Sequence, residues 1–274
     1  MLRWKEERQG ETALLIEGAR RIGKSTIVEE FAKNEYSSYI LVDFSKTATE
    51  INDLFNDLSD LNYIFLRLQL NYNVSLEERK SLIIFDEVQN NPKARQAIKH
   101  LVKDHRYDYI ETGSLISIRK NVQNIIIPSE ETRITMHPMD FEEFRWAMGD
   151  NVSFTLLKTV LEQKQPLGEA IHRKLMRDFR LYMLVGGMPQ AVDKYIKTNN
   201  LSAVDTVKRD IIALYEEDLR KIDTSGKATA MFDAIPSQLS KNASRYTIST
   251  VIPGEKQDRI SDIVQLMEES RVAN

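Results

Sequence analysis

The sequence contains no cysteine. This absence excludes a disulfide framework, a thiolate metal site and a cysteine nucleophile. There are only four histidines, and they stand apart without the H-x-x-x-H spacing of a zinc ligand pair. No apolar run approaches the ~20 residues that a helix needs to cross a bilayer, so we expect no membrane partner. The first ten residues are charged rather than apolar, which does not fit a secretory signal and favours a cytoplasmic location.

The chain also lacks a strong excess of charge of one sign. Its net charge is -3, which argues against a globally basic nucleic-acid binder but leaves a local basic patch open. What is present is an ordinary globular composition over 274 residues, with 42% hydrophobic and 29% charged residues. This length suits about two domains, and this composition can bury a core.

The first half of the chain alternates short apolar runs with amphipathic segments, which is typical of a parallel sheet with helices on both faces. We predict strands at residues 12–17, 39–44, 82–85, 107–112 and 133–136. We predict helices at residues 24–34, over most of 49–70, and at 140–148.

Two helices, one of them additional to those above, carry specific expectations. Asn91 is a suitable N-cap and Pro92 a suitable first residue for a further helix. Its buried face is expected to consist of Ala94, Ala97, Ile98, Leu101 and Val102. In the helix at 140–148, the residues expected to face inward are Phe141, Phe144 and Met148.

Beyond residue 150 the strand-like runs end and long helical patterns follow, so we place a domain boundary there. A polar, glycine-containing stretch at 223–226 marks a second boundary. After it we expect helices at 229–239 and 258–269, separated by a segment with strand propensity at 246–251.

Residues 18–25, GARRIGKS, match the pattern G-x-x-x-x-G-K-[ST] of a phosphate-binding loop. Its glycines let the backbone curl so that N–H groups point at phosphate oxygens. Lys24 supplies positive charge to the β- and γ-phosphates, and Ser25 offers a hydroxyl to Mg²⁺. The motif follows a predicted buried strand and opens a predicted helix, which disfavours the alternative of a glycine turn that binds nothing. The predicted nucleotide-binding residues are Gly18, Ala19, Arg20, Arg21, Ile22, Gly23, Lys24, Ser25 and Thr26.

A second motif, LIIFDE, spans residues 82–87 and has the Walker B form of four apolar residues followed by an acid. The acid falls at the carboxyl edge of the predicted sheet, where ligands bind in open α/β folds. Asp86 is expected to hold Mg²⁺, and Glu87 to act as general base on the attacking water. The alternative is an exposed acidic pair that only ends a strand, which the upstream loop makes less favourable.

A third polar stretch, ETGS, ends the fourth predicted strand. Thr112 and Ser114 are candidates for contact with the γ-phosphate or the lytic water. Because serine and threonine also favour turns and helix N-caps, both interpretations stay open.

The ordered motifs resemble those of the AAA-like P-loop ATPases expanded in archaea and bacteroidetes, whose C-terminal part is a domain of unknown function. The resemblance begins with the loop GARRIGKST, in which Ser25 replaces the more common threonine, and with IIFDEVQ, including Gln89. It continues through the segments TGS at 112–114, Arg133, PMDFEEF at 138–144, GGMP at 186–189 and KRDI at 208–211.

This resemblance implies a sheet with an inserted strand between the loop strand and the Walker B strand. It implies ATP with Mg²⁺ as the ligand, and it adds Arg20 and Arg133 to the site residues. The implied fold class is a P-loop NTPase core over 1–150, a helical lid over 151–222, and a partial winged-helix-like segment over 223–274 that we expect to be incomplete.

Several functions remain open at this point. The first is an ATPase that turns over and moves its lid and winged-helix-like segment. The second is a switch that binds ATP and rarely hydrolyses it, as a homo-oligomer or with an unknown protein partner. A third is DNA binding through the tail, whose available cations are Lys241, Arg245, Lys256 and Arg259. A small-molecule kinase fits the loop but explains neither Glu87 nor the tail.

Overall fold

The computed structural model describes residues 1–114, 130–240, 246–254, 261, 263–265 and 267. The chain divides into two compact units. The first consists of residues 1–136 together with 218–274, and the second of residues 137–217.

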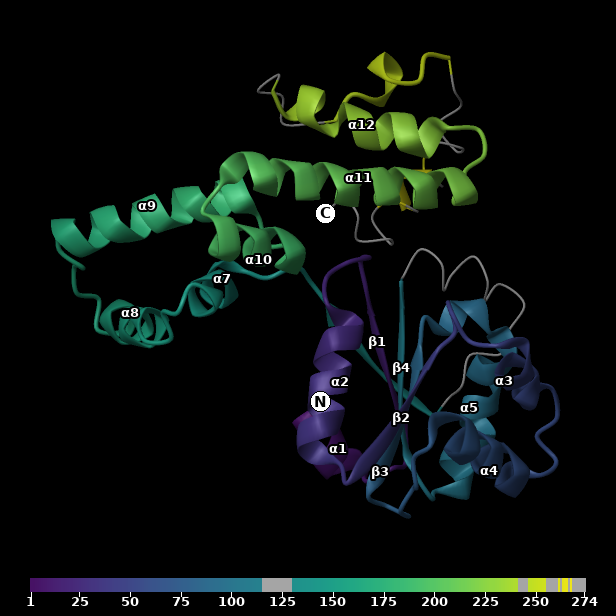
Figure 1. Ribbon diagram of the computed structural model, residues 1–274. Helices are drawn as coiled ribbons and strands as arrows, with labels where there is room; N and C mark the ends of the chain where they lie inside the picture. Colours follow the sequence, from purple (N-terminus) through teal and green to yellow (C-terminus); the bar gives the residue numbers. More distant parts are fainter. Residues whose placement is uncertain (115–129, 241–245, 255–260, 262, 266, 268–274) are drawn as a thin grey trace. The chain divides into compact units, whose positions relative to one another are not determined.

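The first unit is built on a five-stranded sheet in the described residues (Figure 1). Its strands are β1 (Ala13–Gly18), β2 (Ser38–Asp43), β3 (Ser81–Asp86), β4 (Asp108–Ser114) and β5 (Glu131–Met136). Their order is β2-β3-β4-β1-β5, and every neighbouring pair is parallel. β4 therefore lies between the loop strand β1 and the Walker B strand β3, so the expected inserted strand is confirmed. The α/β fold class is confirmed with it.

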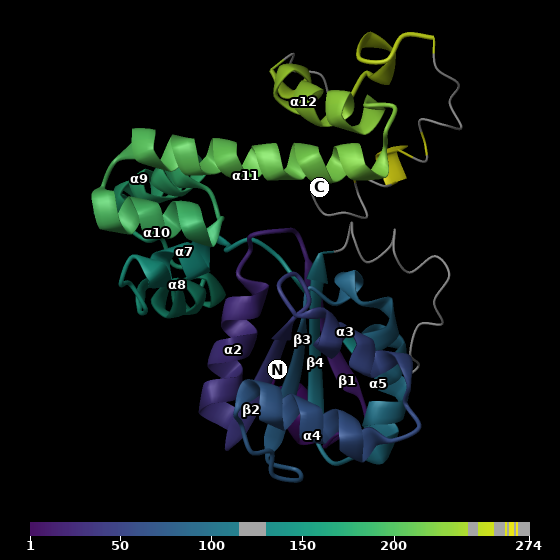
Figure 2. The same ribbon diagram turned by 45° about the vertical axis from the view of Figure 1, so that its right-hand side comes forward.

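Helices cover both faces of this sheet (Figure 2). One face is covered by α1 (Leu2–Arg8) and α2 (Lys24–Glu35), whose buried residues pack with Leu14, Ile16 and Ile84. The other face is covered by α3 (Thr49–Asp53), α4 (Leu61–Tyr72) and α5 (Pro92–Asp104). Two short 3₁₀ helices, Leu54–Asn56 and Val88–Asn90, join these elements. Because both faces are covered, the strands β1, β3 and β4 are buried along almost their whole length.

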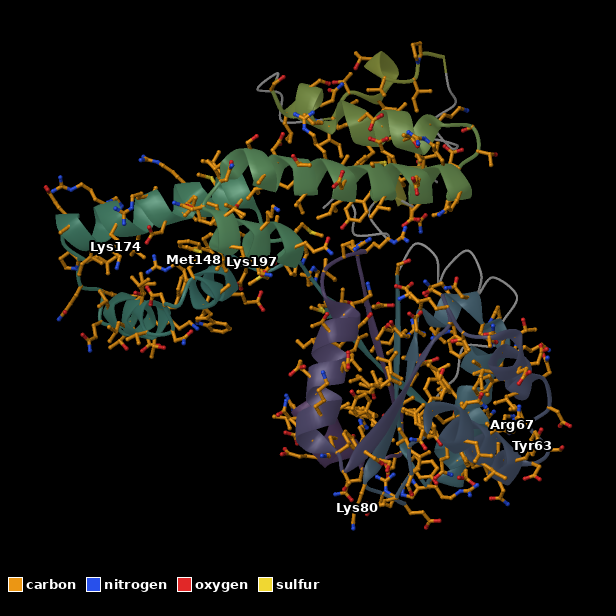
Figure 3. All side chains as sticks on the ribbon, viewed as in Figure 1. Tyr63, Arg67, Lys80, Met148, Lys174 and Lys197 are labelled. Carbon is orange, nitrogen blue, oxygen red and sulfur yellow. The ribbon has the colours of Figure 1, made fainter. Side chains whose placement is uncertain are left out.

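The helix predicted over most of residues 49–70 is interrupted. It consists of α3, a 3₁₀ turn and α4, because Asp60 leaves the helical conformation and caps α4 by accepting a hydrogen bond from the Tyr63 amide at 3.1 Å. The outer face of α4 exposes Tyr63, Leu66 and Leu70, and Arg67 of this helix pairs with Glu50 at 3.2 Å (Figure 3). Aspartate favours an N-cap over a helix interior, which explains the interruption.

The expectations for α5 are confirmed in detail. Asn91 caps it by accepting from the Ala94 amide at 3.0 Å, and Pro92 is its first residue. All five apolar residues expected on its inner face are buried.

The second unit contains α7 (Phe141–Ala147), α8 (Ser153–Glu162), α9 (Glu169–Val185), α10 (Pro189–Thr198) and the first part of α11 (Leu201–Ile222). Its core includes Phe144 and Val185, and Phe141 stacks edge-on against Phe179 at 5.2 Å. The expectation that Met148 faces inward is wrong: 42% of this residue is exposed, because α7 ends at Ala147.

α7 packs with α9, and its Phe144 belongs to the core of the second unit. The units consequently separate at residue 136, whereas the sequence placed the boundary near 150. The approach of Gly187 to Met139 holds this arrangement: the Met139 amide donates to the Gly187 carbonyl at 2.8 Å. A Cβ on Gly187 would lie 2.1 Å from the Met139 carbonyl oxygen. The segment GGMP (186–189) thus packs closely against the residues that precede α7 and leads into α10.

After α11 the chain forms α12 (Lys227–Leu239) and a 3₁₀ turn, Ile248–Thr250. The strand propensity predicted for 246–251 is therefore not realised as a strand. The Gln238 side chain explains this, because it accepts from the Thr247 amide at 3.2 Å and donates to the Thr250 hydroxyl at 3.0 Å. Most of the helix predicted at 258–269 lies outside the described residues. Among the helices that the structure describes, none is both long and apolar enough to span a membrane.

Candidate functional site

The polar ends of β1, β3 and β4 lie at one edge of the sheet. Because these strands are parallel neighbours, their carboxyl ends meet there. The register pairs Gly18 of β1 with Ser114 of β4 and with Met136 of β5. The loop of residues 18–25 therefore begins at the same edge at which Asp86 ends β3.

The loop has the backbone geometry that its glycines predict. Gly23 has φ 92° and is the N-cap of α2, and Arg21 has φ 67°. At Gly18 the limit is space: a Cβ would lie 2.3 Å from the Met136 carbonyl oxygen and 2.6 Å from the Ile22 side chain. Ile22 is fully buried beneath the loop. The curled backbone and the start of α2 together form the kind of anion-binding terminus that phosphate requires.

Lys24 lies within this loop, with 6% of the residue exposed. Its ammonium donates to the carbonyl oxygens of Ala19 at 2.8 Å and Gly18 at 3.2 Å. Burial lowers the pKa of Lys24 from its usual value, and Arg20 adds to this, whereas Glu87 and Asp86 oppose it. A buried cation surrounded by backbone dipoles is well placed for phosphate oxygens.

Ser25, Asp86 and Thr112 converge on one carboxylate oxygen. The Ser25 hydroxyl donates to Asp86 Oδ1 at 2.7 Å, and the Thr112 hydroxyl donates to the same oxygen. Asp86 and Thr112 are buried. Serine and aspartate oxygens are the hard ligands that Mg²⁺ prefers, so the residues fit this ion. Among the described residues, no group of three or more histidines, aspartates or glutamates could hold a metal ion by itself. Phosphate oxygens and water would therefore complete the coordination of Mg²⁺.

Glu87 follows directly and has an unusual backbone, with φ 53° and ψ 46°. Its amide donates to the Thr112 hydroxyl at 3.4 Å, and its carboxylate Oε2 accepts from the side-chain amide of Gln89. From the sequence, Gln89 was noted only as part of the resemblance. Its spacing of two residues from Glu87, within one tight turn, was the available signal.

Three further predicted residues lie on the same unit. Ser114 is buried at the end of β4, and Thr26 is exposed on α2. Arg20 pairs with Asp218 near the end of α11, with its Nη1 3.1 Å from the carboxylate. Asp218 was missed, because nothing in the sequence links a helix residue to a loop 198 positions away.

The structure does not bring Arg133 to this group. Arg133 lies in mid-strand on β5, opposite Leu15, and pairs with Glu131 at 2.6 Å. Side chains two positions apart on a strand share a face, and Glu131 contacts Arg95 of α5. Arg133 thus lies on the face covered by α5. Asp86, which accepts from Ser25 of α2 and from Thr112, lies on the other face.

Arg95 forms a buried ion cluster on that opposite face. Its guanidinium contacts Glu111 at 3.2 Å and Glu131 at 2.9 Å, and all three side chains are almost wholly buried. Burial raises the pKa of Glu111 well above its ordinary value; Glu131 adds to this and Arg95 opposes it. The cluster joins α5, β4 and β5. Its Glu111 precedes Thr112 on β4, so the two side chains lie on opposite faces of the sheet.

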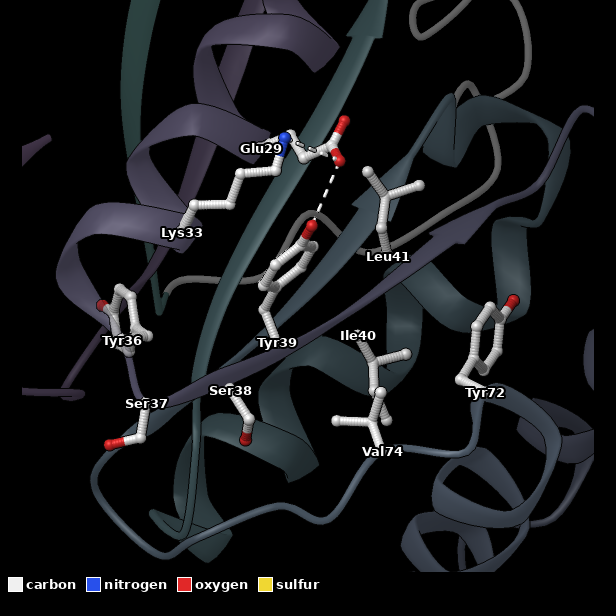
Figure 4. A pocket seen from close by; sticks show the side chains of 10 residues that line it. All are labelled: Glu29, Lys33, Tyr36, Ser37, Ser38, Tyr39, Ile40, Leu41, Tyr72 and Val74. Atoms are coloured by element: carbon white, nitrogen blue, oxygen red, sulfur yellow. Dashed lines mark hydrogen bonds and ion pairs between the residues drawn. The ribbon is translucent and has the colours of Figure 1, made fainter.

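A hollow of about 660 Å³ lies beside the edge strand β2 (Figure 4). The Tyr39 hydroxyl there donates to Glu29 at 3.1 Å, and Glu29 also pairs with Lys33 at 3.2 Å. No residue of the loop or of the Asp86–Glu87 pair lines this hollow. The candidate site is therefore defined by the strand ends and not by this hollow.

Fold and site together define the class of P-loop NTPases. The sheet is parallel, a glycine loop opens a helix, and an acid ends β3, which one inserted strand separates from the loop strand. Comparison of sequences agrees with this. Residues 10–145 match the AAA domain, and residues 176–274 match a domain of unknown function (DUF8612). The chain thus carries an AAA domain followed by a C-terminal domain of unknown function, as the motifs predicted.

Comparison with solved structures found the following similarities, among others. The ORC1 protein of Aeropyrum pernix, solved in complex with DNA, is 12% identical; the match covers 98% of this chain and 82% of that chain, with a TM-score of 0.40. The Hef helicase domain of Pyrococcus furiosus is 13% identical over 97% and 67% of the two chains, with a TM-score of 0.24. Similarities this low carry no argument about ligands. No curated protein matches the chain.

Proposed function

We propose that the chain is a Mg²⁺-dependent ATPase whose site lies at the carboxyl edge of the sheet. The observation that carries this proposal is the 2.7 Å hydrogen bond between the loop residue Ser25 and the strand-end residue Asp86. These residues are distant in sequence and come from the two motifs that such an enzyme needs. Their contact brings the phosphate loop and the acidic pair into one site.

Each residue has a separate role in this proposal. Lys24 and the loop amides hold the β- and γ-phosphates, and Ser25 and Asp86 hold Mg²⁺. When bound, Mg²⁺ withdraws charge from the phosphate oxygens. Glu87 orients the attacking water and takes its proton. The Thr112 hydroxyl donates to Asp86 and accepts a hydrogen bond from the Glu87 amide, so we assign Thr112 a positioning role.

Coupling to the rest of the chain is part of the proposal. Arg20 belongs to the loop and pairs with Asp218, which lies near the end of α11. An anionic phosphate beside Arg20 would compete with the Asp218 carboxylate for the same guanidinium. Nucleotide binding would then change the contact between the loop and α11, and through it the lid and winged-helix-like segment.

Equilibrium binding and phosphate release test the proposal. We expect wild type to bind ATP with Mg²⁺, and Lys24→Ala to bind at least tenfold more weakly, because a charged contact of this kind is worth roughly 1.5–3 kcal/mol. Turnover should be measured over a range of protein concentrations. Turnover that rises with concentration indicates an arginine supplied by a second copy, and ATP binding without turnover supports the switch instead. No ATP binding contradicts both.

DNA binding by the tail remains a hypothesis from the sequence. Its four cations, Lys241, Arg245, Lys256 and Arg259, lie outside the described residues. A DNA mobility-shift assay at several salt concentrations tests it, because phosphate contacts give a steep loss of affinity with salt.

A further inference from the structure

We propose that Gln89 is the residue that positions Glu87 for catalysis. This inference rests on the proposed ATPase function and concerns the same site. Gln89 Nε2 donates to Glu87 Oε2, and 5% of Gln89 is exposed. The fold of the sheet does not require a buried side-chain amide that donates to the proposed base.

The turn around Glu87 makes this contact. Glu87 has a left-handed backbone and precedes the 3₁₀ helix Val88–Asn90. The Asn90 amide donates to the Glu87 carbonyl at 3.0 Å, which closes the turn. Val88 is fully buried in the core, and its packing there stabilises the turn. With the backbone fixed in this way, the Gln89 side chain returns across the turn to the carboxylate.

Glu87 is therefore held at two points. Thr112 accepts its backbone amide at 3.4 Å, and Gln89 donates to its carboxylate. An unrestrained glutamate has several rotamers and loses side-chain entropy when it is ordered. Because these hydrogen bonds exist before the reaction, the loss of side-chain entropy is not part of the barrier to the catalytic step.

The chemistry of an amide suits this role. A lysine or arginine at the same place would neutralise the carboxylate and weaken it as a base. The neutral Gln89 amide orients one oxygen, Oε2, without adding positive charge. The other oxygen, Oε1, is the one that we assign to the attacking water. Gln89 does not itself contact the reacting atoms, so it is a positioning residue.

Two substitutions of Gln89 separate the donor from the shape of the side chain. Gln89→Met keeps the length and removes the donor, and Gln89→Glu keeps the shape and places a carboxylate against Glu87. We expect each to leave the Kd for ATP within about twofold and to lower kcat by about tenfold, a part of the roughly 10²–10⁴ that a general base contributes. Asn90→Ala, an exposed side chain in the same turn, is the control and should keep the wild-type kcat.

A kcat equal to wild type in both Gln89 variants overturns the inference. Equal losses of ATP affinity and kcat, together with a lower Tm, also overturn it, since they show a purely structural role. A selective fall in kcat supports it.

The hydrogen bond can also be measured without turnover. The NMR signal of the Gln89 side-chain amide should have different chemical shifts in wild type and in Glu87→Ala. No shift contradicts the contact even if the protein is an active ATPase. A shift in a protein that never hydrolyses ATP contradicts the proposed function and with it the catalytic role of Gln89, while the hydrogen bond itself is retained.

Discussion

The buried ammonium of Lys24 is the most sharply defined single residue of the site. Its ammonium donates to the backbone carbonyls of Gly18 and Ala19 in its own loop, and burial lowers its pKa. Between this lowered pKa and the ordinary value of 10.5, the unfolded chain binds more protons than the folded chain. Stability contributed by Lys24 therefore rises with pH in that window.

This effect can be measured against Lys24→Met, which has no titrating group. We expect the unfolding free energy of wild type, relative to Lys24→Met, to increase as pH rises toward 10.5 in protein without nucleotide. Urea unfolding at several pH values checks it. A constant or falling difference would show that the folded protein does not disfavour the charged lysine.

Gly18 gives a prediction about packing alone. A methyl group there meets the Met136 carbonyl oxygen at 2.3 Å, and that atom belongs to the backbone of a neighbouring strand. We expect Gly18→Ala to destabilise the protein by about 1–3 kcal/mol, the usual cost of overpacking, and to weaken ATP binding. Denaturant unfolding measures the first effect. An unchanged midpoint would show that β5 moves freely away from the loop.

At the scale of elements, the buried cluster of Arg95, Glu111 and Glu131 fastens α5 to β4 and β5. Removing Arg95 leaves the buried Glu111 without its cation and leaves Glu131 with Arg133 alone. We expect Arg95→Ala to cost about 3–5 kcal/mol, the range for breaking a buried ion pair. Arg133→Ala is the comparison, because it removes the partly exposed partner of Glu131 (the Arg133 side chain is 45% exposed) and leaves Arg95 in place. We expect it to cost less than Arg95→Ala.

Arg133→Ala also tests its place in the site. The resemblance placed Arg133 among the site residues, but it lies on the opposite face of the sheet from Asp86. We therefore expect kcat to stay within about twofold of wild type, as for other residues that make no contact with the reacting groups. A large loss of kcat in a stable Arg133→Ala protein would mean that this arginine reaches the nucleotide in another way.

The sequence predicted elements well where local signals agreed. In α5 the N-cap, the proline and the apolar period all coincide, and each expectation was met. It failed where a polar residue interrupts a continuous apolar period, as Asp60 does before α4. It also failed at Met148, because the end of α7 decides exposure more than periodicity does. Side-chain contacts such as Gln238 with Thr247 have no local pattern and could not be predicted.

At the scale of the whole molecule, the motifs predicted which residues meet at the sheet edge, because parallel strands bring their carboxyl ends together. They did not predict Asp218 as a partner of Arg20, since that contact depends on tertiary structure. They also placed the boundary near residue 150, where strand-like sequence ends. The packing of α7 against α9 moves the division to residue 136.

The central claim is that this edge both binds and hydrolyses ATP, and Glu87→Gln tests it most directly. The substitution keeps the shape of the side chain and removes the base, while Lys24, Ser25 and Asp86 remain. We predict that Glu87→Gln binds ATP as tightly as wild type and loses phosphate release by about 10²–10⁴-fold. Phosphate release at the wild-type rate by Glu87→Gln would contradict the account.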